Sequence, residues 1–79
     1  MSRTRLLAAT KAHSAADIWR RLLPRERAVI LCAGVEEPIA APHTVIQSLT
    51  GWGLLVARAR GHVLTRAGLQ VQEHGRGEA

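Results

Sequence analysis

The sequence predicts a small α+β domain in which three to four helices pack against one two-stranded β-hairpin. Apolar residues recur at helical spacing over much of the chain, and residues 54–64 hold two short apolar runs separated by a glycine-containing turn. The length of 79 residues allows one domain. Because the chain has two Trp and no Phe or Tyr, we expect a core of Leu, Val, Ile and Ala.

The first half of the chain is expected to hold two helices. Ser14 and Asp17 have the spacing of a helix-capping pair, and apolar residues follow at helical intervals. Pro24 suits the first turn of the next helix, which we expect to be buried over residues 24–33 and to end at Gly34 in a left-handed conformation. Residues 1–13 are expected to form a basic arm or a short helix ahead of a domain that spans 14–74.

Cys32 is the only cysteine, so an internal disulfide is excluded. Because it lies in an apolar run, we expect it to be a small core residue rather than a nucleophile.

The second half is expected to form a third helix, the hairpin and a last helix. From His43, apolar residues at positions 45, 46 and 49 fit one helical face, and glycines follow. Residues 54–59 and 62–64 are the expected strands, joined by a tight turn at Arg60 and Gly61. Thr65 is expected to cap the last helix, with Ala67, Leu69 and Val71 as candidates for burial, and residues 75–79 to form a disordered tail.

Three segments resemble the DNA-binding part of MarR-type bacterial regulators. Residues 23–31, LPRERAVIL, resemble the helix that opens it, and residues 44–56, TVIQSLTGWGLLV, resemble the recognition helix that runs into the wing. Residues 62–68, HVLTRAG, resemble the closing Leu-Thr-x-x-Gly phrase. The resemblance covers about two-thirds of the chain. It implies a winged-helix fold and a small phage or bacterial regulator of transcription.

The chain departs from this family between its second and third helices. The family places a full helix there, the first of the helix-turn-helix pair, whereas residues 35–42 are few and contain two prolines. Either that helix is reduced to one turn, or the unit is not a true helix-turn-helix. The departure bears on DNA docking, because the missing helix normally crosses the backbone and fixes the reading helix.

The excess of eleven Lys and Arg over six Asp and Glu gives a formal charge of +5 and favours a polyanionic partner, double-stranded DNA first. In a DNA complex, base edges would be contacted from the third helix by His43, Thr44, Gln47 and Ser48. Phosphates would be contacted from the hairpin and the last helix by Arg58, Arg60, His62 and Arg66. The alternatives are a solvated helix face and ordinary charge protection of a hairpin edge.

A second basic cluster comprises Arg20, Arg21, Arg25 and Arg27. These residues could extend a DNA footprint, bind an acidic partner, or line the wet side of two helices; the last is the favoured interpretation.

No enzyme, cofactor or metal site is expected from the sequence. Its four histidines are scattered, no cysteine pair is present, and the carboxylates form no evident acid–base pair. No apolar run approaches the roughly 20 residues of a membrane span, so a cytoplasmic protein is expected.

The alternative function is a protein-interaction module on a winged-helix scaffold, such as an adaptor or a small phage or mobile-element inhibitor of a nucleic-acid-handling complex. A homodimer is also possible from the sequence, although no long heptad seam predicts one.

Overall fold

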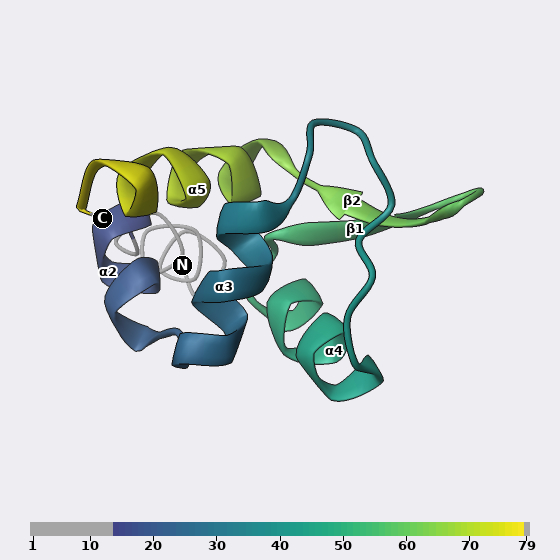
Figure 1. The fold of residues 1–79 in the computed structure, drawn as a ribbon, viewed down its shortest axis with the longest axis horizontal. Coiled ribbons are helices and arrows are strands. Elements are labelled where there is room, and N and C mark those ends of the chain that lie inside the picture. The colour runs from purple at the N-terminus through teal and green to yellow at the C-terminus, as the bar shows by residue number, and fades with distance from the viewer. Residues whose placement is uncertain (1–13, 79) are drawn as a thin grey trace, which may run out of the picture.

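A computed structural model describes residues 14–78 of the protein, and in this part it shows four helices and a two-stranded antiparallel hairpin (Figure 1). The elements in chain order are α2 (Ala15–Arg21), α3 (Pro24–Cys32), α4 (His43–Gly51), β1 (Leu55–Arg58), β2 (Gly61–Leu64) and α5 (Arg66–Glu78). The predicted α+β class is therefore confirmed. The expected arm or helix at residues 1–13 lies outside the described residues.

The helix α2 begins as the sequence predicts. The Ser14 hydroxyl accepts a hydrogen bond from the Asp17 N–H at 3.2 Å, which satisfies one of the free amides of the first turn. The Asp17 carboxylate also forms an ion pair with Arg20, and its hydrogen bond from that guanidinium lowers the pKa of Asp17. One side of α2 buries Ile18 and Trp19.

The helix α3 is less buried than predicted. Only Glu26 and Ile30 are buried, and Cys32 is exposed, so the expectations of a buried helix over 24–33 and of a core cysteine are wrong. Glu26 is buried, and its carboxylate is partly compensated by the Leu23 N–H, which donates to it at 2.8 Å. The helix ends at Ala33 in an extended conformation, and the expected left-handed stop at Gly34 is absent.

The link between α3 and α4 contains no helix. Its one turn is at residues 35–36, where Glu36 adopts a positive φ of 56°. Further along, the Ile39 N–H donates to the His62 carbonyl at 2.9 Å, which ties the link to β2. In Figure 1 the link arches over the hairpin and descends to the start of α4. The helix that the MarR-type pattern places here is therefore missing altogether.

The core lies where α5 packs against α2, α3 and the base of the hairpin, and α4 closes it from the side of α3 and β1. Its largest fully buried side chains come from four different elements or their ends: Ile30, Leu49, Leu54 and Val71. Among the expected residues of α5, Val71 is buried, Leu69 is half-buried and Ala67 is exposed. Sequence reasoning missed Gln72, which is buried and donates to the carbonyls of Ile30 at 2.8 Å and Ala33 at 2.6 Å. This amide completes the carboxyl end of α3.

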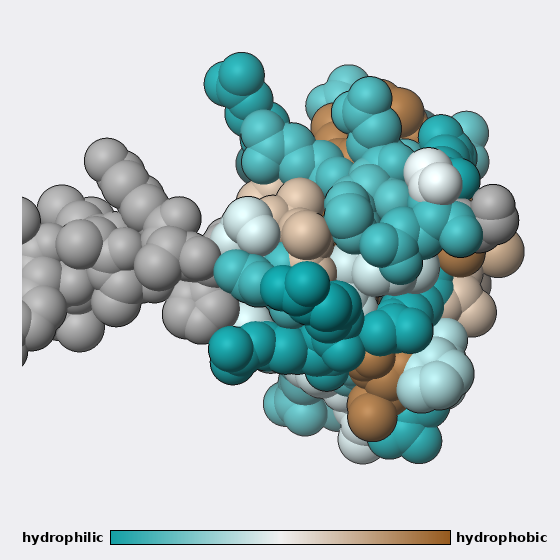
Figure 2. Space-filling view, turned by 90° about the vertical axis from the view of Figure 1, so that its left-hand side faces the viewer, coloured by the Kyte–Doolittle hydropathy of each residue, from teal (hydrophilic) through white to brown (hydrophobic). Residues whose placement is uncertain are grey.

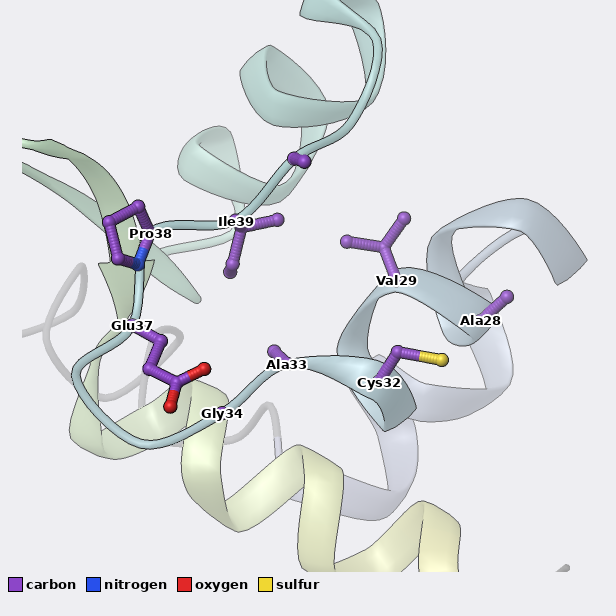
Figure 3. Close-up of a pocket in the computed structure, with 9 residues that line it drawn as sticks. Ala28, Val29, Cys32, Ala33, Gly34, Glu37, Pro38 and Ile39 are labelled. Carbon is purple, nitrogen blue, oxygen red and sulfur yellow. The ribbon is translucent and has the colours of Figure 1, made fainter.

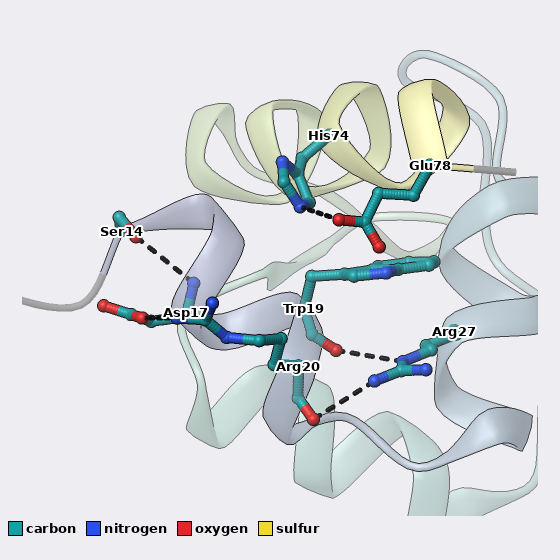
Figure 4. Close-up of polar contacts among 7 residues, drawn as sticks. All are labelled: Ser14, Asp17, Trp19, Arg20, Arg27, His74 and Glu78. Atoms are coloured by element: carbon teal, nitrogen blue, oxygen red, sulfur yellow. Dashed lines mark hydrogen bonds and ion pairs between the residues drawn. The ribbon is translucent and has the colours of Figure 1, made fainter.

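The helix α5 continues to Glu78, so the expected disordered tail is not seen at residues 75–78. Gly75 is buried against the Trp19 ring, where a Cβ would lie 2.5 Å from ring carbons. On its other side the ring carries the Arg27 guanidinium, 5.1 Å from the centroid. Arg27 also donates to the carbonyls of Trp19 at 2.9 Å and Arg20 at 3.1 Å (Figure 4). Because Gly75 has no side chain, α5 can pack directly against the indole, and this contact extends the helix past the predicted end of the domain.

This packing predicts opposite effects for alanine at two glycines of the same helix. Gly75→Ala places a methyl group inside the contact distance of Trp19, and we expect it to lower the free energy of unfolding by about 1–3 kcal/mol. Gly77→Ala meets nothing within 4 Å and is expected to raise that energy by up to about 1 kcal/mol, because alanine favours helix. Urea denaturation followed by circular dichroism measures both, and equal effects would contradict the packing argument.

Candidate nucleic-acid interface

The helix α4 presents a polar face opposite its buried one. Val45, Ile46 and Leu49 are buried at helical spacing, which directs the intervening positions outward. Three exposed polar residues of this face were all predicted from the sequence: His43, Thr44 and Gln47. The predicted Ser48 is half-buried rather than exposed, so its side chain lies at the margin of this face.

Both ends of α4 are fixed by backbone hydrogen bonds. The Pro42 carbonyl accepts the N–H groups of Val45 and Ile46, each at 3.0 Å, and no side chain caps this end. At the other end, Gly53 takes a φ of +80°, a conformation that favours glycine, and the next residue returns its N–H to Leu49 at 3.0 Å. The chain therefore turns directly from α4 into the hairpin.

The hairpin pairs antiparallel, with Leu55 opposite Leu64 and Arg58 opposite Gly61. The turn is at residues 59–60, one position before the predicted one, because Gly61 already belongs to β2 with a φ of +137°. Arg58 and Arg60 are exposed, and the hairpin tip projects from the body of the molecule (Figure 1). The predicted His62 is half-buried and pairs with Ala57 across the strands.

Thr65 fastens the hairpin to the two helices that flank it. Its hydroxyl accepts the Gly68 N–H at 3.0 Å, which is the predicted cap of α5, and donates to the Gly53 carbonyl at 2.6 Å. Its own N–H donates to the Leu54 carbonyl at 2.9 Å. One residue thus holds the end of α4, the base of the hairpin and the start of α5, where Arg66 is exposed.

The predicted arginines line two shallow hollows beside the hairpin. Arg58 and Arg66 share the first with apolar residues of β1, β2 and α5, and Arg58 and Arg60 share the second with Pro38 and Val63. Among residues 14–78 none of these arginines has a carboxylate within 4 Å. Glu36, which sequence reasoning missed, lines both hollows. The sequence signal that could have found Glu36 was the short connection between the second and third helices, because a short connection has to run close to the hairpin.

The second basic cluster is used differently. Arg20 pairs with Asp17, and Arg27 is held by Trp19 and two backbone carbonyls, so both have structural partners. Arg21 and Arg25 are exposed. Figure 2 views the molecule from the side of α2 and the end of α5, and this face is mostly hydrophilic with apolar areas near its margins. The arginines of the hairpin lie at the other end of the molecule (Figure 1).

An apolar groove of about 440 Å³ opens between α3 and the link (Figure 3). Val29 on α3 and Ile39 on the link face its interior, and Ala28 and Cys32 lie along the helix wall. The Glu37 carboxylate folds back over Gly34, with an oxygen 2.7 Å from where a Cβ of that glycine would be. Because no helix covers α3 here, its outer side chains border a cleft that can accept an apolar side chain.

Comparison with known proteins does not add to this geometry. No family model matches the sequence, and no characterised protein or solved structure matches it significantly. Within residues 14–78 no group of three or more His, Cys, Asp or Glu side chains could hold a metal ion. No helix in that range is long and apolar enough to cross a membrane.

Thr65 provides a test of how firmly the hairpin is held. Thr65→Val keeps the shape of the side chain but removes the hydroxyl, leaving the Gly68 N–H and the Gly53 carbonyl without it. We expect the free energy of unfolding to fall by about 1–3 kcal/mol and amide exchange in the hairpin to accelerate. Thr65→Ser keeps the hydroxyl and is the control. If the two variants exchange alike, the hydroxyl does not hold the hairpin.

Proposed function

We propose that this protein binds double-stranded DNA as a small winged-helix regulator of transcription, with α4 as the recognition helix and the β1–β2 hairpin as the wing. The observation that carries the proposal is a set of exposed arginines on the hairpin and at the start of α5 that have no carboxylate partner within residues 14–78: Arg58, Arg60 and Arg66. The hairpin that bears the first two follows directly after α4. The role is one of binding, without an enzymatic step or a cofactor.

The chemistry of the two surfaces fits two kinds of DNA contact. The exposed Gln47 amide can donate to and accept from one adenine edge in the major groove, and His43 and Thr44 are at the helix end that usually enters first. The guanidinium groups of the wing suit phosphate oxygens, which position a protein without reading sequence. In this proposal α4 supplies specificity and the wing supplies affinity.

The absent helix of the helix-turn-helix pair requires another support for α4. The buried side chains Val45, Ile46 and Leu49 hold the helix to the core, and the Thr65 junction fixes its end to the wing. The hydrogen bond from Ile39 in the link to His62 of β2 fixes the chain that leads into the start of α4. These contacts favour a recognition helix that is positioned by the core and the wing rather than by a preceding helix.

The proposal is tested by removing charge from the wing. We expect Arg58→Ala with Arg60→Ala to weaken binding to any duplex about tenfold or more, because two charged contacts to phosphate are lost. The slope of log affinity against log salt should become shallower by about two. Fluorescence anisotropy titrations with a random-sequence duplex measure both quantities.

The matched control removes the same charge at the other end of the molecule. Arg21→Ala with Arg25→Ala changes two exposed arginines around α2 and the start of α3, and we expect a much smaller loss. Equal losses in the two double variants would show general charge attraction instead of a wing contact. Absence of duplex binding by the native protein at low salt would end the proposal.

A protein-interaction role is the second candidate, and the groove between α3 and the link favours it. An amphipathic helix of a partner protein fits this cleft if it directs an apolar side chain between Val29 and Ile39 and a basic one toward Glu37. Such an occupant would take the place of the absent helix.

This second role predicts that a charge at the groove prevents partner capture. Ala28→Glu adds a carboxylate at an exposed position of the groove wall, whereas Gln70→Glu adds one on α5 outside it. Affinity capture from host extract should recover one stoichiometric protein with the native chain and with Gln70→Glu, but not with Ala28→Glu. A partner retained by both variants would bind elsewhere.

A further inference from the structure

Glu36 lies beside the arginines of the hairpin, because it lines the same two hollows. It follows α3 in the link, and the hydrogen bond from Ile39 to His62 keeps this part of the chain against the hairpin. Contact between Pro38 and the Gly61 position, where a Cβ would lie 3.5 Å from the proline ring, holds the link close to the turn. The backbone that follows Glu36 is therefore held beside the hairpin.

The surroundings of Glu36 differ from those of the neighbouring Glu37. Glu36 lines both hollows beside the hairpin, and Arg58 lines both as well. Glu37 turns the other way and borders the groove beside α3. No ion pair within 4 Å joins Glu36 to an arginine of the described chain. Glu36 therefore lies beside Arg58 without pairing with it, and the arginines stay open to other anions.

The backbone at Glu36 makes the position unusual. Its φ of 56° lies in the left-handed region, which costs conformational free energy for a residue with a Cβ. Glycine or asparagine adopts this conformation more readily. A glutamate at this position therefore gives the link no conformational advantage, and its carboxylate is the feature that needs an explanation.

We propose that Glu36 limits the affinity of this surface for phosphate backbones, by competing with phosphate for Arg58 and its neighbours. The inference rests on the proposed DNA binding and adds a residue that sets its specificity. A domain with a charge of +5 and unpaired arginines is expected to attract any duplex. A carboxylate beside those arginines should weaken binding to all sequences alike. The base contacts of α4 then make up a larger share of the total, which raises discrimination between sites.

The test compares charge removal at two glutamates. Glu36→Gln keeps the size and backbone preference of the side chain, and we expect it to bind a random-sequence duplex about two- to fivefold more tightly than the native protein at low salt. Glu73→Gln removes the same charge from an exposed position of α5 that lines neither hollow, and it should leave affinity unchanged. Anisotropy titrations at several salt concentrations measure both variants.

Two further variants connect the effect to the arginine and to charge. In an Arg58→Ala background, Glu36→Gln should lose most of its effect, because the guanidinium for which the carboxylate and the phosphate compete is gone. Glu36→Gly removes the carboxylate and relieves the backbone, so it should tighten binding as Glu36→Gln does while raising thermal stability.

The outcomes separate this inference from the DNA-binding proposal. If the native protein binds duplex and Glu36→Gln binds no more tightly than Glu73→Gln, Glu36 does not limit affinity, and DNA binding stands. If the gain persists undiminished without Arg58, competition for that guanidinium is wrong. If neither the native protein nor Glu36→Gln binds duplex at low salt, both proposals are overturned.

Discussion

The arrangement of this molecule depends on the junction at Thr65. Its hydroxyl and N–H bond to the carbonyls of Gly53 and Leu54, while the hydroxyl also accepts the amide that begins α5. Gly68 makes the junction possible, because a Cβ there would lie 2.3 Å from the Leu54 carbonyl oxygen. A two-stranded hairpin is marginally stable alone. Here two helices hold the base of the hairpin, so its tip can project into solvent without contributing to the stability of the fold.

This junction explains how α4 is positioned although no helix lies between α3 and α4. The start of α4 has no side-chain cap, and the link ahead of it has no helix to pack the first turn. The position of α4 is set instead from its carboxyl end and from its buried face, through Leu49 and the hydrogen bond from Leu54. The consequence appears on α3, whose outer side chains border an open groove. The exposure of Cys32 and the open groove thus have the same cause.

Local patterns in the sequence predict most of the elements, because each is specified by neighbours along the chain. The Ser14 cap, the apolar face of α4 and the glycines around the hairpin all act within a few residues. Features set by distant residues could not be predicted in this way. Gly75 suggests a frayed end until Trp19 is known to lie against it, and Gln72 has no expected partner until the carbonyls of α3 face it.

The candidate site also combines features that local sequence patterns predict with features that depend on distant residues. The exposed positions of α4 and the arginines of the hairpin follow from periodicity and turn chemistry, so the sequence places them correctly on the surface. Their relation to the link does not follow, because it depends on the hydrogen bond between Ile39 and His62, residues 23 positions apart. That contact brings a carboxylate to the basic end.

The two groups of arginines show how the fold distributes its charge. Around α2, Arg20 forms an ion pair with Asp17. Arg27 of α3 stacks on the Trp19 ring and donates to two backbone carbonyls of α2, which joins the two helices. At the hairpin, short strands and a bare turn offer no such acceptors, and the arginines there remain available. A guanidinium without an internal partner gives the fold little stability and is open to contact with other molecules. For that reason the hairpin end, and not the larger cluster near α2, is where binding should be sought.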